Sequence, residues 1–176
     1  MLADTGCRVR GATIQDCNSP AAWPLKTIAR RIAKEKPDII LNPGDYYYRE
    51  QACPPADQAL CGGTPPPVAG MPFTDSADGW LVDVIQPMKP MFRSAPMALL
   101  RGNHETCDRG GNGFFLFFDP RPDTAGLCGP VNGVAPAPAT TPTWSFTIDV
   151  AKGRTLRVAM VDSAYGEDSV VDSWAA

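Results

Sequence analysis

Residues 97–105 constrain the fold most, because a short apolar run there passes directly into a polar cluster. Residues 97–100 (M-A-L-L) have the length and composition of a buried strand. Residues 102–105 (G-N-H-E) contain His104, the only histidine among 176 residues. Open α/β sheets carry their chemistry at the carboxyl ends of the strands. The stretch therefore predicts an α/β fold with polar side chains gathered at one end of a sheet.

Two other polar clusters occupy comparable positions. Residues 4–6 (D-T-G) stand near the amino terminus, and residues 44–48 (G-D-Y-Y-Y) follow the apolar run I-I-L at 39–41. A lone histidine near a strand end is by default a structural residue. Here Asn103 and Glu105 flank it, and the other two clusters follow strand-like runs of their own, so we favour one functional site at the edge of the sheet.

A helix is predicted over about residues 20–36. Ser19 is its expected N-cap and Pro20 its first residue, since the fixed φ of proline suits that position. Apolar residues recur at helical spacing, and the basic residues on the other face are interpreted as solvent-exposed surface. Pro37 ends the helix before a strand at 38–42, which makes a strand–helix–strand unit with a right-handed crossover.

The later elements are less regular. A second helix is predicted over about residues 78–88, after which Pro87 and Pro90 lead into the next strand. The aromatic run at 114–118 is expected in the core. Strands at 144–150 and 156–161 flank a turn at Lys152-Gly153 and predict an antiparallel hairpin that starts a second sheet. The Pro- and Gly-rich loop at 49–79 is long enough to wall an active site.

Charge and hydropathy exclude two classes of partner. A net charge of −3 shows no basic surface for a polyanion, so we expect no nucleic acid as a stable partner. No apolar run approaches the ~18 residues that a membrane-spanning helix needs.

The six cysteines fall in three close sequential pairs, namely Cys7 with Cys17, Cys53 with Cys61, and Cys107 with Cys128. No pair has the C-x-x-C spacing of a zinc site, so disulfides that close surface loops are favoured over buried free thiols. Disulfides indicate an extracytoplasmic protein, periplasmic or secreted. Because the chain shows no signal peptide, either the export signal lies upstream or the cysteines are not paired.

Taken in order, D-x-G, G-D-x-x-Y and G-N-H-E resemble the motifs of the calcineurin-like metallophosphoesterase superfamily. They are most similar to its purple acid phosphatase branch, which has D-x-G where most of the superfamily has D-x-H and which adds the tyrosine. The resemblance covers roughly residues 2 to 163. It implies the hydrolysis of a small-molecule phosphoester with two metal ions, iron with zinc or manganese.

The resemblance also implies a role for each motif residue. Asp4 would bind the first metal ion, Asp45 would bridge both, Tyr48 would bind the first as phenolate, and Asn103 would bind the second through its amide oxygen. His104 would contact the phosphate or protonate the leaving group. Glu105 would be its partner at the other ring nitrogen and fix the tautomer.

The sequence also departs from the family. The family's second half supplies further histidines, typically in V-x-x-H and G-H-x-H motifs, whereas none follows His104 here. Only Met1, Leu2 and Ala3 precede Asp4, where the family has a complete strand. We therefore expect residues 1–176 to be a single incomplete domain. It would be the loop-rich N-terminal part of a four-layer α/β/β/α sandwich without its first strand and its histidine-bearing C-terminal half, and inactive alone.

Two functions stay open at this point. The first is a metal-dependent phosphoesterase, and the second is a non-catalytic, disulfide-stapled binding domain on the same scaffold. A Ser-His-Asp hydrolase is disfavoured, because the sequence contains no G-x-S-x-G elbow.

Overall fold

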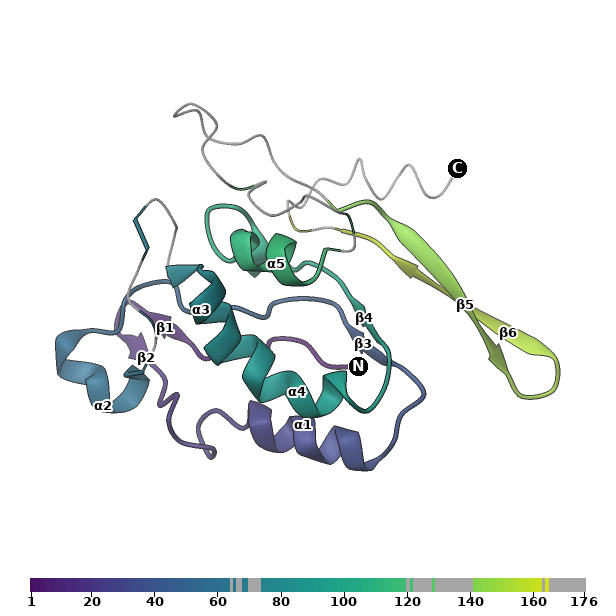
Figure 1. The fold of residues 1–176 in the computed structure, drawn as a ribbon, viewed down its shortest axis with the longest axis horizontal. Coiled ribbons are helices and arrows are strands. Elements are labelled where there is room, and N and C mark those ends of the chain that lie inside the picture. Colours follow the sequence, from purple (N-terminus) through teal and green to yellow (C-terminus); the bar gives the residue numbers. More distant parts are fainter. Residues whose placement is uncertain are drawn as a thin grey trace.

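The computed structural model describes residues 1–63, 65, 68–69, 74–119, 121, 128, 141–162 and 164. The fold combines short helices with three two-stranded sheets, one parallel and two antiparallel (Figure 1). The predicted mixed α/β fold is confirmed. Among the described residues, no helix is both long and apolar enough to cross a membrane.

The parallel sheet consists of β3 (Ile40–Asn42) and β4 (Met97–Leu99), with Ile40 opposite Met97 and Asn42 opposite Leu99. The amino-terminal segment runs beside β3, because the Leu2 N–H donates to the carbonyl of Leu41 at 3.0 Å. The segment therefore lies beside β3, in the position of a first strand, although no strand is assigned before β1. Asp4, Asp45 and Asn103 follow these three neighbouring segments, so they lie at the same end of the parallel sheet.

The first helix, α1, spans Leu25–Lys34 and packs against α4. The expected start at Ser19 and Pro20 is wrong. The Ser19 carbonyl instead accepts from the N–H of Ala22 and Trp23 in a turn. Pro24 explains the difference, since it has no N–H for a carbonyl four residues earlier and its ring would crowd that carbonyl. The basic face of α1 is exposed, as predicted.

A second helical stretch runs without a break through α3 (Ala77–Trp80), the π-helical turn η3 (Leu81–Ile85) and α4 (Gln86–Phe92). The expectation that Pro87 and Pro90 lead out of the helix is wrong. Pro87 is the second residue of α4, one turn beyond the start of η3, and the wider π-helical turn gives room where proline lacks its N–H. Ser76 caps the stretch by accepting from the Gly79 N–H at 3.2 Å.

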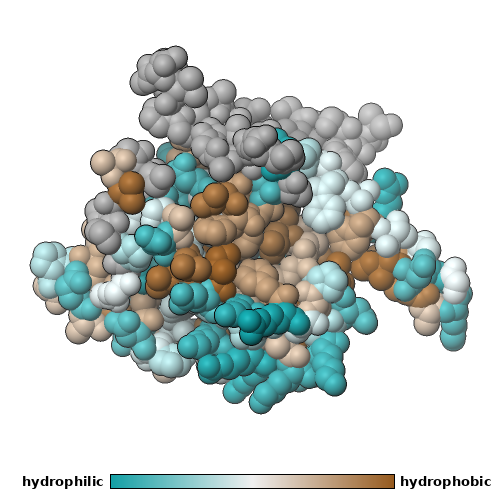
Figure 2. All heavy atoms as spheres, viewed as in Figure 1, coloured by the Kyte–Doolittle hydropathy of each residue, from teal (hydrophilic) through white to brown (hydrophobic). Residues whose placement is uncertain are grey.

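The core lies between these helices and the parallel sheet. Tyr47 stacks on Trp80 with ring centroids 5.6 Å apart, and Phe114 and Phe115 of α5 (Gly111–Phe117) are buried. Leu116 and Phe117 are exposed, so only part of the aromatic run belongs to the core. Figure 2 shows hydrophobic residues over the middle of this face and hydrophilic ones below, over α1.

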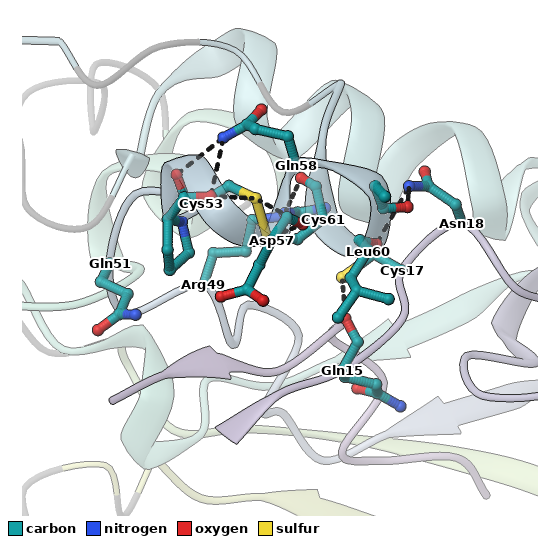
Figure 3. Close-up of a disulfide and its surroundings, with 12 residues drawn as sticks. Gln15, Cys17, Asn18, Arg49, Gln51, Cys53, Asp57, Gln58, Leu60 and Cys61 are labelled. Carbon is teal, nitrogen blue, oxygen red and sulfur yellow. Dashed lines mark hydrogen bonds between the residues drawn. A yellow bond between two sulfur atoms is a disulfide. The ribbon is translucent and has the colours of Figure 1, made fainter. Parts of the chain in front are cut away.

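All three predicted disulfides are present, Cys7–Cys17, Cys53–Cys61 and Cys107–Cys128. The first closes over a small hairpin, β1 (Val9–Arg10) and β2 (Thr13–Ile14), which we did not predict. The second ties the 3₁₀ turn η1 (Pro55–Asp57) and α2 (Gln58–Cys61), where Gln58 donates to the carbonyl of Cys53 at 2.9 Å (Figure 3).

The second antiparallel sheet is the predicted hairpin, formed by β5 (Trp144–Val150) and β6 (Arg154–Met160). It extends away from the helices, and Lys152 and Gly153 in its turn have positive φ. The register places one apolar row on a single face, consisting of Trp144, Phe146 and Ile148 opposite Met160, Val158 and Leu156.

Candidate functional site

Three loops meet in one cleft at the end of the parallel sheet. The cleft has a volume of about 290 Å³. Its lining comes from the segment before β1, the loop after β3 and the loop after β4, and consists of Ala3, Asp4, Pro43, Gly44, Asp45, Arg101, Gly102 and Asn103. The described part of the loop at 49–79 contributes none of these lining residues, but its Glu50 lies 3.4 Å from Nδ1 of His104 beside the cleft.

Close backbone approach fixes the shape of the cleft. A Cβ on Gly44, which has φ +116°, would lie 2.2 Å from the backbone nitrogen of Gly102. A Cβ on Gly102 would in turn lie 2.1 Å from Oδ1 of Asp45. Asp4 and Asp45 themselves have positive φ, 53° and 59°. Such conformations are costly for residues other than glycine, and they are held here by the surrounding contacts.

Tyr48 brings the two aspartates together. Its hydroxyl donates to Oδ1 of Asp4 at 2.6 Å and lies 3.2 Å from Oδ2 of Asp45. Burial first, and then hydrogen bonds and charge from these carboxylates, raise the pKa of Tyr48 far above its usual range. The structure thus unites three of the predicted metal-site residues. Asn103, the fourth, lines the same cleft.

Glu105 has a different position from the one expected. It is fully buried, and its carboxylate accepts hydrogen bonds from four backbone N–H groups, those of Asp45, Tyr46, Tyr47 and Gly102 at 2.8 to 3.1 Å. Burial raises the pKa of Glu105 to about 7, against the lowering effect of these N–H groups. The expectation that it contacts the ring of His104 is wrong, because Glu105 instead joins the two loops that shape the cleft.

The actual neighbours of the His104 ring are Tyr48, Arg109 and Glu50. The ring stacks on Tyr48 with centroids 3.8 Å apart, and Nη2 of Arg109 lies 2.6 Å from Nδ1. Oε1 of Glu50 is 3.4 Å from the same nitrogen. Burial first, and then the Arg109 guanidinium, lower the pKa of His104. Sequence reasoning missed both charged neighbours. The only signal in the sequence was their closeness to the motifs, since Glu50 comes two residues after Tyr48 and Arg109 comes five residues after His104.

The donor set suits a hard cation. Two carboxylates, a phenol and an amide supply oxygen ligands of the kind that such ions take. The described residues contain no group of three or more His, Cys, Asp or Glu side chains placed to hold a metal ion. Asp4 and Asp45 supply the carboxylate oxygens of this donor set.

Comparison with known proteins agrees with this geometry. A protein-family model described as calcineurin-like phosphoesterase matches residues 2–163. No curated protein and no solved structure matches the chain significantly. The family match covers all three loops of the cleft and most of the sequence. The chain belongs to the calcineurin-like phosphoesterase family.

Proposed function

We propose that this protein hydrolyses small-molecule phosphate esters with two metal ions bound in the cleft. The observation that carries the proposal is the convergence of Asp4, Asp45 and Tyr48, which are joined by hydrogen bonds in a cleft that Asn103 also lines. Family membership supports the reaction class, and the placement of these side chains supports the location of the site.

The proposed ligands are those that the motifs indicate. Asp4 and Tyr48 hold the first ion, Asp45 holds both, and Asn103 holds the second. When bound, such a pair of ions neutralises the phosphate charge and activates a water molecule. The D-x-G motif and Tyr48 favour the purple acid phosphatase branch, and hence iron paired with zinc or manganese.

His104 is proposed to act on the substrate rather than on the metal. Its backbone N–H donates to Oδ1 of Asp45 at 3.0 Å, which places the residue directly beside the proposed bridging ligand. From that position a ring N–H can donate to a phosphate oxygen or to the leaving-group oxygen. Glu105 supports the site structurally, by holding the loops of Asp45 and Gly102 together.

The three disulfides support a further proposal, an extracytoplasmic location. Disulfides persist in oxidising compartments such as the periplasm or the extracellular space. This location fits the proposed iron centre and the loop-rich exterior of the fold.

Metal binding is the first test of the proposed function. We expect calorimetry with Mn²⁺ or Zn²⁺ to show binding to the wild-type chain and a loss of at least about tenfold in affinity for Asp45→Asn, since one carboxylate serves both ions. Asp149→Asn, an exposed aspartate on β5, is the matched control and should bind like wild type. Equal affinity in all three proteins would contradict the assignment.

Turnover is the second test. Because the chain has a single histidine, which is not among the proposed ligands, the second ion has few donors and we expect slow hydrolysis of a chromogenic phosphoester. Hydrolysis should nevertheless depend on added metal and disappear in Asp45→Asn. Hydrolysis that persists in Asp45→Asn would contradict the proposed site.

A further inference from the structure

The ring of His104 is enclosed by three side chains from two different parts of the chain. Tyr48 covers one face, Nη2 of Arg109 lies 2.6 Å from Nδ1 and 3.0 Å from Nε2, and Oε1 of Glu50 lies 3.4 Å from Nδ1. The side chains of His104, Arg109 and Glu50 are only 14%, 20% and 11% exposed. The imidazole therefore has little freedom to rotate.

Arg109 and Glu50 are themselves held in place. Nη2 of Arg109 bonds to Oε1 of Glu50, and Nη1 donates to the carbonyl of Asn103 at 3.4 Å. The second carboxylate oxygen of Glu50 pairs with Arg10 on β1 at 3.0 Å, and the Glu50 N–H donates to the carbonyl of Val9 at 3.0 Å. A chain of charged groups thus connects the small hairpin to the ring of His104.

From these contacts we infer that Arg109 and Glu50 are positioning residues that set the orientation and tautomer of His104, an inference that rests on the proposed function. A guanidinium only donates hydrogen bonds, so the ring nitrogen that it contacts must bear a lone pair. Nη2 approaches both ring nitrogens, but a neutral ring has only one lone-pair nitrogen, so only one of the two contacts can be a hydrogen bond. We assign it to Nδ1, the nearer nitrogen, which leaves the ring hydrogen on Nε2. Glu50 holds Arg109 in that position.

The consequence concerns the substrate. A ring fixed against Tyr48 with its hydrogen on Nε2 presents one defined donor to a phosphate or leaving-group oxygen. When the ring turns freely, the same donor is in place only part of the time. The loss then falls on kcat, because substrate binding by the other groups in the cleft is unchanged.

The test uses the fact that His104 is the only histidine in the chain. Labelling histidine with ¹³C and ¹⁵N gives a single imidazole spin system, read in the protein without metal or substrate. Wild type should show ¹⁵N shifts of the Nε2–H tautomer and a nuclear Overhauser effect to the ring of Tyr48. Arg109→Ala should give averaged ¹⁵N shifts and lose that contact. Arg109→Lys, which keeps a donor, should restore the wild-type tautomer.

Two further variants complete the design. Glu50→Gln should shift the imidazole signals in the same direction as Arg109→Ala, since Arg109 loses its charged anchor. Arg30→Ala, which removes an exposed arginine on α1, should leave them unchanged. Backbone amide spectra establish that each variant is folded, and Glu50→Gln carries the test if Arg109→Ala is not. Unchanged imidazole signals in the folded variants of Arg109 and Glu50 would overturn the inference.

This readout needs no turnover, so it stands even if the proposed hydrolysis fails. Where hydrolysis is measurable, Arg109→Ala should lower kcat at least about tenfold, and by no more than the 10²–10⁴-fold that general acid–base catalysis contributes in full, with KM changed less than about threefold. An equal fall in kcat for Arg30→Ala would show that the loss does not come from the position of His104.

Discussion

At the scale of single residues, the shape of the cleft depends on Glu105, although its carboxylate is not part of the cleft lining. Glu105 accepts four backbone hydrogen bonds from the loops after β3 and β4. Those loops approach so closely that Gly44 and Gly102 leave no room for a Cβ. Without the carboxylate of Glu105, these four N–H groups would have no acceptor, and the two loops would separate. Glu105 is therefore a structural determinant of where Asp45 lies.

Glu105→Gln should destabilise the protein although the two side chains have the same shape. The amide keeps one acceptor oxygen and turns an NH₂ donor toward backbone donors. We expect a loss of about 2–4 kcal/mol in the free energy of unfolding, since hydrogen bonds to charged groups contribute more than neutral ones and unpaired buried donors are costly. Urea denaturation measures it. Glu35→Gln, an exposed residue after α1, is the control and should change stability by less than about 0.5 kcal/mol.

Tyr48→Phe tests the proposed phenolate ligand. Metal binding must displace the proton from Tyr48, whose pKa is raised by burial and by the two neighbouring aspartates. Protein loaded with Fe³⁺ should then show a visible charge-transfer band that the substitution removes. Tyr47→Phe is the neighbouring control, because its hydroxyl bonds to the Thr74 carbonyl in the core, and it should keep the band. A band that survives Tyr48→Phe would mean that Tyr48 only walls the cleft.

Individual residues were predicted where the strand ends dictate their position. Asp4, Asp45 and Asn103 each follow a segment of the central layer, and parallel strand ends converge. The direction of Glu105 was not predictable in this way, because neighbours in a 3₁₀ turn of three residues project to different sides. Arg109 and Glu50 reach His104 from separate turns, and sequence spacing does not encode that contact.

At the scale of elements, α5 packs on the start of the long helical stretch through a glycine. A Cβ on Gly113 would lie 2.0 Å from the indole ring of Trp80. Asp75 fixes both elements, since its Oδ1 accepts from Nε1 of Trp80 at 2.7 Å and from the Gly113 N–H at 2.9 Å. The indole can therefore not move aside without breaking a buried hydrogen bond.

Gly113→Ala should accordingly cost stability, against the usual gain from alanine in a helix. We expect a loss of about 1–3 kcal/mol in the free energy of unfolding, the usual range for overpacking a core. Urea denaturation followed by tryptophan fluorescence reports it. Leu116→Ala lies on the same helix with Leu116 46% exposed, and it should cost much less. A Gly113→Ala protein as stable as wild type would mean that the two elements separate easily.

Element types followed from periodicity, but their ends depended on prolines. The strand predicted at 144–150 has the same bounds in the structure, because alternating apolar and polar residues and a Lys-Gly turn determine a hairpin locally. The start of α1 was misplaced because Pro24 outweighs the Pro20 signal. The end of α4 was misplaced because a π-helical turn before Pro87 lets the helix continue.

At the scale of the whole molecule, two disulfides fasten loops outside the main core, whereas Cys107–Cys128 packs into it. Cys7–Cys17 and Cys53–Cys61 lie in a small cluster with Val9, apart from the main core. Cys107–Cys128 borders α5, where a Cβ on Gly111 would lie 2.7 Å from Sγ of Cys128. It also closes the turn that carries Arg109.

Of the three disulfides, Cys107–Cys128 should stabilise the protein most. It closes 21 residues, against 10 and 8 for the other two, and a longer loop loses more entropy when it is cross-linked. Replacing both cysteines by serine should lower the free energy of unfolding by about 3 kcal/mol, slightly more than for either other pair. Peptide mapping without reduction first establishes the three pairings, and urea denaturation of the three double variants then ranks them. Free thiols at these positions would remove both this ranking and the support for an extracytoplasmic location.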